Sequence, residues 1–238
     1  MPEHENVYRN EADRYHALVS CEDYKKKLPS AIQAIIPRGS SILESGAGTG
    51  RVTNILASIA GELTGLDLSV PMLVKAAAVT PIDNRVIHGF SAGDHRFLPI
   101  SGSRYDWVVS GWSVCYLASW NRDDWKPQVN AALKEFTRVL RAAGKILLIE
   151  TLGTGELTPN PPEHLIDYLS YLDKLGFQRT WIRTDYRFAD ETNARELTGF
   201  FFGEGMLEKI DFSSNPILPE CTGLWLINKA DLLKSLPD

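Results

Sequence analysis

Residues 41–51 read Ser-Ile-Leu-Glu-Ser-Gly-Ala-Gly-Thr-Gly-Arg, and the patterns in the rest of the chain are best understood from this stretch. Its aliphatic start suits a buried parallel strand. Gly46, Gly48 and Gly50 follow at every second position, and a helical 3.6-residue periodicity begins at Val52. The stretch therefore predicts a strand, a glycine turn and a helix. In that arrangement a nucleotide-like ligand lies against the backbone at the carboxyl end of the strand.

The spacing of the glycines distinguishes between two kinds of nucleotide ligand. A dinucleotide site follows the pattern G-x-G-x-x-G, and its third glycine would fall at position 51, where this chain has Arg51. Glu44, two residues before the first glycine, is unfavourable beside a diphosphate and suits a ligand with an ammonium group. The pattern thus disfavours NAD and favours S-adenosylmethionine (SAM), which carries an ammonium group and no phosphate.

The segment from Glu44 to Gly50 resembles the first motif of the class I SAM-dependent methyltransferases, of the small-molecule, type 11/25-like kind. This resemblance implies an α/β fold: a Rossmann-like, seven-stranded, mostly parallel sheet with helices on both faces and an N-terminal helical extension. It also implies that the turn contacts the cofactor. The candidate cofactor-binding residues in it are Glu44, Gly46, Ala47, Gly48, Thr49 and Gly50.

A second motif, Gly-Leu-Asp-Leu-Ser, lies at residues 65–69 and ends a short strand expected over 62–67. Asp67 stands 17 residues after Gly50, where a carboxylate accepts hydrogen bonds from ribose hydroxyls. Asp67 could instead cap the helix expected over 71–78, but Ser69 can fill that role. We therefore assign Asp67 and Leu68 to the cofactor site, and the motif also resembles that of the family.

A third segment, Gly-Asp-His-Arg-Phe-Leu-Pro-Ile at 93–100, follows a strand expected over 85–89 and resembles a further motif of the family. The resemblance implies that Asp94 accepts from the adenine amino group and that the His95 amide donates to the ring, with Gly93 beside them. A smaller residue is usual at the position of His95. The His95 side chain could pack on the adenine or titrate near it. A surface histidine in a loop is the commoner case, so we expect that position and give His95 no catalytic role.

The strand expected over 105–110 resembles the family's fourth, so its end, Ser110-Gly111-Trp112, is expected to face the methyl group of the cofactor. Gly111 permits close approach of the backbone. Trp112, Tyr116, Trp120 and Trp125 follow closely. They either pack in the core or form a wall whose aromatic faces attract a sulfonium methyl group and apolar or cationic substrates.

The rest of the chain alternates helical and strand patterns. Residues 1–10 are polar and expected to be frayed, and two helical pieces fill 11–36. The later expectations are a helix over 125–140, a turn at Ala142-Ala143-Gly144, a strand over 145–150 and a loop over 153–162. They continue with a helix over 163–175, a strand over 177–188, a helix over 193–210, a strand over 224–227 and a helix over 230–236. We expect one domain over 1–238, divided into a helical lid (1–37), a SAM-binding core (38–150) and a substrate-side part (151–238).

Composition excludes several functional classes. The 238 residues carry a net charge of −5, which disfavours nucleic acid as a partner. No apolar run reaches the length of a membrane span, and the N-terminus does not read as a signal peptide. The three cysteines show no paired framework, so reduced thiols and a cytoplasmic location are expected. The chain has no His/Cys cluster with metal-ligand spacing.

Methyl transfer from a sulfonium requires mainly alignment, so it needs no dedicated catalytic residue when the acceptor is an amine or a thiol. A hydroxyl or carbon acceptor needs a base, for which His16, His95, Glu150 and Tyr186 are candidates without a choice among them. Tyr15, with Tyr8, His16 and Tyr24, could reach a ligand from the N-terminal helices, or these side chains could simply pack there.

We therefore predict a SAM-dependent methyltransferase that acts on a small molecule. The alternatives are a catalytically inactive SAM-binding partner protein, a methyltransferase acting on RNA or protein, and, least favoured, a nicotinamide-dependent oxidoreductase. The sequence leaves open whether N, O, S or C is methylated, and it leaves the oligomeric state open.

Overall fold

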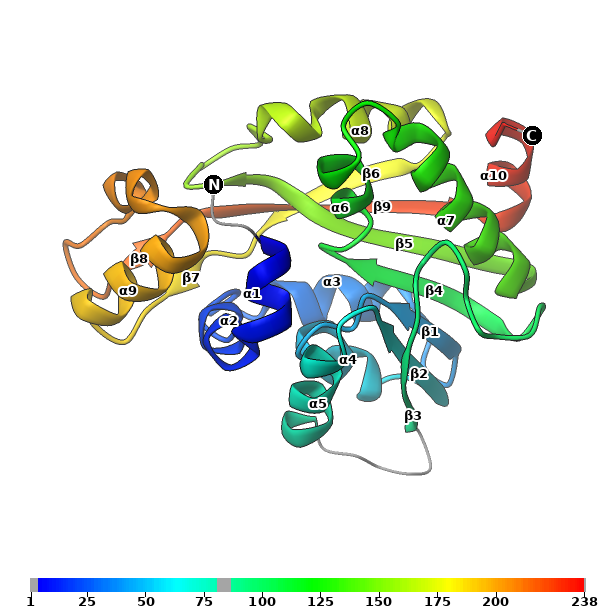
Figure 1. The fold of residues 1–238 in the computed structure, drawn as a ribbon, viewed down its shortest axis with the longest axis horizontal. Coiled ribbons are helices and arrows are strands. Elements are labelled where there is room, and N and C mark those ends of the chain that lie inside the picture. Colours follow the sequence, from blue (N-terminus) through cyan, green and yellow to red (C-terminus); the bar gives the residue numbers. More distant parts are fainter. Residues whose placement is uncertain (1–3, 81–86, 238) are drawn as a thin grey trace.

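A seven-stranded sheet forms the centre of this computed structural model, which describes residues 4–80 and 87–237 (Figure 1). The strand order is β3-β2-β1-β4-β5-β9-β6, and β9 runs antiparallel to both of its neighbours. This arrangement confirms the Rossmann-like, seven-stranded, mostly parallel sheet expected from the sequence. The strands are β1 (Ser41–Ser45), β2 (Glu62–Asp67), β3 (Ile87–Ala92), β4 (Tyr105–Gly111), β5 (Leu140–Thr154), β6 (Gln178–Arg183) and β9 (Glu220–Asn228).

Helices cover both faces of the sheet, and each face has its own apolar core. The larger core lies against α6 (Cys115–Trp120), α7 (Trp125–Val139) and α8 (Glu163–Lys174). The second lies against α3 (Lys27–Ile35) and α4 (Arg51–Ala57). Helix α5 (Val70–Val79) packs on β2 and β3, and α10 (Lys229–Ser235) packs on β5 and β9. Because the layers on both sides hold the sheet rigid, the loops at the ends of its strands are well placed to form a site.

A third core, beside the sheet, joins the N-terminal helices to residues 186–218. Helices α1 (His4–Asn10) and α2 (Ala12–Val19) pack against a lobe from the C-terminal part of the chain (Figure 1). Val7 and Leu18 meet Phe188, Leu197 and Phe201 in this core. The lobe consists of β7 (Tyr186–Arg187), α9 (Glu191–Phe202), the 3-10 helix η1 (Glu204–Lys209) and β8 (Ile217–Leu218).

The structure corrects several expectations about individual elements. Residues 4–10 form helix α1 rather than a frayed end, because Val7 is buried in the third core. The expected turn over 142–144 is absent, since α7 ends at Val139 and β5 begins directly at Leu140. The strand β5 then continues to Thr154, so the loop that follows is shorter than expected.

Two elements of the C-terminal part are interrupted where one continuous element was expected. The strand predicted over 177–188 is split into β6 and β7 at Thr184 and Asp185. The helix predicted over 193–210 ends at Gly203, whose φ of 88° is incompatible with a helix, and η1 follows it. Of the strand predicted over 85–89, residues 85 and 86 lie outside the described residues.

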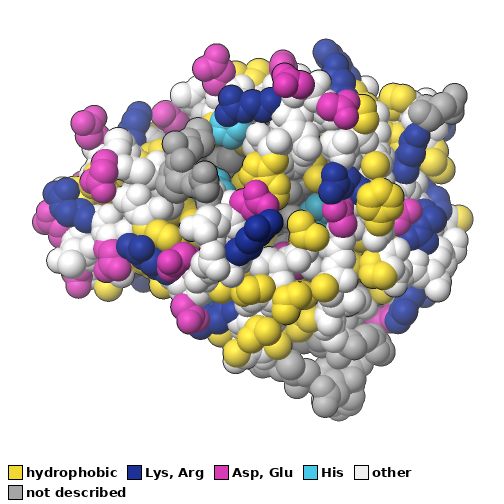
Figure 2. Space-filling model, viewed as in Figure 1, with side chains coloured by type: hydrophobic (Ala, Val, Ile, Leu, Met, Phe, Trp, Pro, Cys, Tyr) yellow, Lys and Arg dark blue, Asp and Glu magenta, His cyan; other side chains and the backbone are white. Residues whose placement is uncertain are grey.

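The surface in Figure 2 mixes positive and negative side chains, and hydrophobic side chains gather on it where Figure 1 places α5. Leu68, Val70 and Val74 are among the exposed hydrophobic residues of that region. Within residues 4–80 and 87–237, no helix is both long and apolar enough to cross a membrane. The cysteines Cys21, Cys115 and Cys221 all carry free thiols, as expected.

Candidate active site

Two adjoining cavities lie where the parallel strands end. We call the first, of about 540 Å³, the glycine-turn cavity, because Gly46, Gly48 and Asp67 line it. We call the second, of about 970 Å³, the aromatic cavity, because Tyr186 and Phe201 line it with several other rings. Five residues line both cavities and so form a shared wall: Glu5, Tyr15, Trp112, Tyr116 and Trp120.

The glycine turn is held by hydrogen bonds from its backbone to the next strand. The amides of Gly46 and Ala47 both donate to the Leu66 carbonyl, at 2.7 and 2.9 Å. Gly46, Gly48 and Gly50 all have positive φ, which side chains rarely adopt. A Cβ on Gly46 would overlap the Ser113 hydroxyl, whereas a Cβ on Gly48 would meet no protein atom within 4 Å. The open space at Gly48 is therefore available to a ligand that lies on the backbone.

Asp67 closes the turn from the end of β2. Its Oδ2 accepts from the Gly48 amide and its Oδ1 accepts from the Ser69 amide, both at 2.8 Å. Burial raises the pKa of this carboxyl, although the two amides oppose that effect. Ser69 caps α5 by accepting from the Met72 amide, so Asp67 is not needed as the cap and remains available to a ligand.

Asp94 lies in the same cavity but already has a strong partner. The Arg96 guanidinium donates to both of its oxygens, at 2.9 and 2.6 Å, and lowers the pKa of the carboxyl. Arg96 also donates to Gln128 of α7 at 2.6 Å, which fixes the pair against the helix. A contact between Asp94 and an adenine amino group would therefore be made by a carboxylate that also holds a guanidinium.

The His95 side chain lies inside the site, so the expectation of a surface histidine is wrong. Its Nδ1 is 2.6 Å from the Ser45 hydroxyl and its Nε2 is 2.8 Å from the Ser113 hydroxyl. The ring also stands edge-on to Phe136 in the core. Burial lowers the pKa of His95 to about 4, so the imidazole is neutral at pH 7 and links the glycine turn to the segment after β4.

The other residues assigned from the sequence divide into two groups. Tyr15, Leu68, Gly93, Gly111 and Trp112 line the glycine-turn cavity together with Gly46, Gly48, Asp67, Asp94 and His95. Glu44, Ala47, Thr49, Gly50 and Ser110 do not line it and are buried behind the turn and the strands. Glu44 is 1% exposed, its Oε2 has no hydrogen-bond partner in the part of the chain that the structure describes, and burial raises its pKa to about 8.

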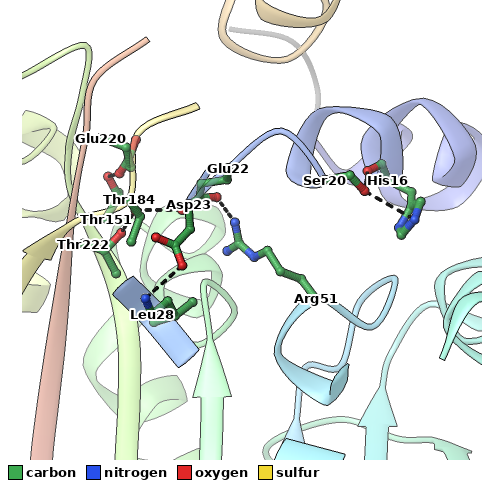
Figure 3. A network of polar contacts seen from close by, with 10 residues as sticks. All are labelled: His16, Ser20, Glu22, Asp23, Leu28, Arg51, Thr151, Thr184, Glu220 and Thr222. Carbon is green, nitrogen blue, oxygen red and sulfur yellow. Dashed lines mark hydrogen bonds and ion pairs between the residues drawn. The ribbon is translucent and has the colours of Figure 1, made fainter. Parts of the chain in front are cut away.

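Trp112 is held in an unusual conformation between the two cavities. Its φ is +47°, which is rare for a bulky side chain, and its amide donates to the Ile149 carbonyl at 2.6 Å. The Arg51 guanidinium lies 3.3 Å from the centre of its ring and pairs with Glu22, which follows α2 (Figure 3). Strain of this kind persists where the surroundings hold it in place, and it is common at functional sites.

The candidate bases and the other aromatic residues named from the sequence do not gather in one site: some line a cavity and others do not. Tyr186 lines the aromatic cavity, and Tyr8 lines the glycine-turn cavity. Glu150 lies under Cys115 and Tyr168, which both donate to it, and burial raises its pKa to about 7. Three other residues line neither cavity: His16, which is 3.1 Å from the Thr49 hydroxyl; Tyr24, which packs against Arg187; and Trp125, which packs on Tyr168 and Tyr171.

Sequence reasoning missed part of the aromatic cavity. Arg51 was considered only as a departure from the dinucleotide pattern, and Glu220 and Thr151 were not considered. All three line this cavity. Glu220 and Thr151 belong to no motif, and only the pairing of β5 with β9 brings them together.

Comparison with known proteins identifies a domain in the middle of the chain that contributes to both cavities. Residues 43–148 match the model of a family described as "Methyltransferase domain". The chain carries a class I methyltransferase domain. The cofactor of this domain is SAM, and the match covers the glycine turn, Asp67, Asp94 and Trp112.

Curated relatives and solved structures are similar to the methyltransferase domain and its surroundings. Demethylmenaquinone methyltransferase of Bacillus licheniformis is 29% identical over 153 residues, which is 62% of this chain and 60% of that protein. Malonyl-[acyl-carrier protein] O-methyltransferase of Pseudescherichia vulneris is 30% identical over 120 residues, 50% of this chain and 42% of that protein. The matches thus span about half of these relatives' length.

Among solved structures, phosphoethanolamine N-methyltransferase 2 of Haemonchus contortus has the same fold. Its TM-score is 0.57 at 14% identity, over 93% of this chain and 60% of that one. That protein was solved with phosphomonomethylethanolamine and S-adenosylhomocysteine (SAH). At this level of identity the likeness establishes the fold of the methyltransferase domain in this chain.

Proposed function

We propose that this protein transfers the methyl group of SAM to a small-molecule acceptor. The main observation in support is the shared wall between the two cavities, which includes Tyr15, Trp112 and Tyr116. A cofactor in the glycine-turn cavity and an acceptor in the aromatic cavity would meet at this wall. Such contact is what direct displacement at a methyl group requires.

Of the residues assigned from the sequence, those that line the glycine-turn cavity would contact SAM: Tyr15, Gly46, Gly48, Asp67, Leu68, Gly93, Asp94, His95, Gly111 and Trp112. The other five, Glu44, Ala47, Thr49, Gly50 and Ser110, lie behind the turn and the strands and would support these contacts from there. Two structural observations support the fit. The space at Gly48 is open where a ligand would approach the backbone, and Asp67 lines that space with a carboxylate whose oxygens can accept further hydrogen bonds. When bound, SAM supplies an electrophilic methyl group on a sulfonium.

The residues of the chain have three tasks in this proposal. Asp67 binds hydroxyl groups, and the neutral His95 holds the turn against the segment that carries Trp112. The aromatic faces of Trp112 and Tyr116 exclude water from the shared wall and favour a positively charged methyl group. Helices α1 and α2, within the proposed lid of residues 1–37, contribute residues to both cavities and so cover the reacting groups.

Calorimetric titration with SAM, SAH and NAD tests the proposal. We expect micromolar binding of the two adenosyl ligands and no binding of NAD, since Arg51 stands where a dinucleotide turn needs glycine. Binding of NAD alone would overturn the proposal. Binding of SAM without methylation of any compound in a metabolite panel would favour an inactive SAM-binding partner protein instead.

The two relatives are named for different acceptors, demethylmenaquinone and malonyl-[acyl-carrier protein], so they do not favour one acceptor for this chain. We propose a small molecule rather than RNA or protein because the aromatic cavity has the size of a small-molecule site. A methylation assay with total RNA and with unfractionated protein as acceptors would expose a macromolecular substrate.

A further inference from the structure

A buried carboxylate, that of Glu220, lies in the wall of the aromatic cavity with half of its hydrogen-bonding capacity unused. Glu220 is the first residue of β9 and is 2% exposed. Its Oε1 accepts from the Thr151 hydroxyl at 2.7 Å (Figure 3). Its Oε2 is buried and has no hydrogen-bond partner among the described residues. Leaving such an oxygen unpaired is costly, so it indicates a missing donor.

The cations near Glu220 are already paired with other carboxylates. The Arg51 guanidinium forms its ion pair with Glu22, and the Arg183 guanidinium lies 2.7 Å from Asp185. Figure 3 shows Arg51 reaching from α4 toward Glu22, while Glu220 lies with Thr151 at the strand ends. Both guanidinium groups are thus engaged by other carboxylates, and neither forms an ion pair with Glu220 among the described residues.

The rings that line the same cavity suit a positive charge. Trp112, Tyr116, Tyr186 and Phe201 all line the same cavity as Glu220. The face of an aromatic ring attracts a cation, and the attraction is stronger where water is excluded. A wall of rings with one unpaired carboxylate therefore matches an ammonium group better than a hydroxyl or a carboxylate.

We propose that the methyl acceptor is a small amine, and that Glu220 binds its nitrogen and receives its proton. The inference rests on the proposed function, because it names the substrate class of that same site. The ammonium group of the acceptor donates to Glu220 Oε2 while its carbon skeleton lies against the rings of the aromatic cavity. Glu220 is thus a catalytic residue that lies outside the sequence motifs of the cofactor site.

The transfer balances without any further reactant. The bound ammonium gives one proton to the Glu220 carboxylate, which frees the nitrogen lone pair. That lone pair forms the new N–C bond to the methyl group while the C–S bond breaks, and the sulfur keeps the electron pair as a neutral thioether. The methylated ammonium carries the positive charge, and the proton on Glu220 passes to water when the products leave.

The environment of Glu220 agrees with this role. Burial raises the pKa of its carboxyl to about 7, although the neighbouring Thr154 and Thr151 side chains and the charge of Arg51 oppose the shift. A carboxylate with a pKa near 7 accepts a proton more readily than an exposed glutamate does. The ammonium of the acceptor supplies both the missing donor and the missing positive charge.

Binding of three probes that differ only in their charged end tests the inference. With SAH bound first, the protein is titrated with 2-phenylethylamine, 2-phenylethanol and 3-phenylpropanoate. We expect the amine to bind about tenfold or more tightly than the alcohol, and the carboxylate to bind weakest. In Glu220→Gln, which keeps the size of the side chain and an acceptor for Thr151, the preference for the amine should disappear.

Glu156→Gln is the matched control. Glu156 also lines the aromatic cavity, but its carboxylate pairs with Lys209 at 3.2 Å, so this variant should keep the preference for the amine. If Glu220→Gln fails to fold, the preference of the unaltered protein decides the question. Equal binding of amine and alcohol, a preference for the carboxylate, or no amine binding at millimolar concentration would overturn the inference and leave the proposed function standing. Failure of the first step, SAH binding, would count against the proposed function instead.

Discussion

Asp67 has two tasks at once, because the oxygens that would hold a ribose also hold the turn. Its carboxylate accepts from the amides of Gly48 and Ser69. We expect Asp67→Ala to weaken SAH binding by about tenfold or more, since a charged acceptor is lost and the turn is loosened. Calorimetry measures the affinity. Asp67→Asn separates the tasks: it keeps one acceptor oxygen, so it should bind better than Asp67→Ala, and unchanged affinity in both would mean that the ribose lies elsewhere.

His95 makes the stability of the protein depend on pH. In the unfolded chain a histidine protonates near pH 6.5, whereas burial lowers the pKa of His95 in the folded protein to about 4. Between these values the unfolded state binds more protons. The free energy of unfolding should therefore fall as the pH drops from about 6.5 toward 4. Urea unfolding at pH 7.5, 6 and 5 measures this loss.

His95→Gln provides the comparison that isolates this contribution. Glutamine can still hydrogen-bond to the hydroxyls of Ser45 and Ser113 but does not titrate. The variant should be less stable than the unaltered protein at pH 7.5 and should lose less stability on acidification. If the two proteins lost stability in parallel over this range, the histidine would not be the responsible group.

At the scale of one element, the glycine turn contains two glycines that are required for different reasons. Gly48 has a φ of +53° and open space around it, so an alanine there costs the fold only about 1–2 kcal/mol of backbone strain. Its methyl group would occupy the ligand's space, so we expect Gly48→Ala to fold and to lose most of its SAH affinity, and Gly48→Val to lose all of it. Thermal unfolding and calorimetry measure the two effects.

Gly46→Ala is the contrasting variant, because a Cβ at Gly46 would overlap the Ser113 side chain. Here the loss should appear in stability as well as in binding, since Ser113 also holds His95. Normal SAH binding by Gly48→Ala would argue against a close approach of the ligand to the backbone at that position.

Elements that have both a clear periodicity and a clear end could be predicted from the sequence. The apolar stripe of Val129, Leu133 and Phe136 predicted α7 to within one residue of its end. Helix α1 could not be predicted in this way, because its buried residue Val7 packs against a lobe far away in the sequence. The break of α9 at Gly203 was likewise masked by the apolar residues on both sides of it.

At the scale of the whole molecule, half of the site was predictable and half was not, for one reason. Asp67 and Gly111 are the last residues of β2 and β4, and Asp94 follows β3. These three strands belong to the parallel half of the sheet, and parallel strands bring such ends to one edge. Glu220 and Tyr186 come from the C-terminal part of the chain. There β9 runs antiparallel to its neighbours, and β7 lies outside the main sheet. Their meeting depends on this topology, which no local pattern in the sequence specifies.

Substitution of Trp225 measures how much the antiparallel strand β9 contributes to the stability of the molecule. Its side chain is fully buried in the larger core, and its Nε1 donates to Asp173 of α8 at 3.1 Å. We expect Trp225→Ala to lower the free energy of unfolding by about 3–5 kcal/mol. Trp181→Ala, on the edge strand β6 and 45% exposed, should lower it far less. Similar losses in urea titrations would mean that β9 contributes little to the core.

The wall shared by the two cavities has a consequence for inhibition. Tyr15, Trp112 and Tyr116 line both spaces, so a single molecule with an adenosyl part and an amine joined by a short linker could fill both at once. Such a bisubstrate inhibitor makes its second contact at a high effective concentration, so it should bind far more tightly than either half alone. Its selectivity would come from the aromatic half, since the adenosyl half is common to the class.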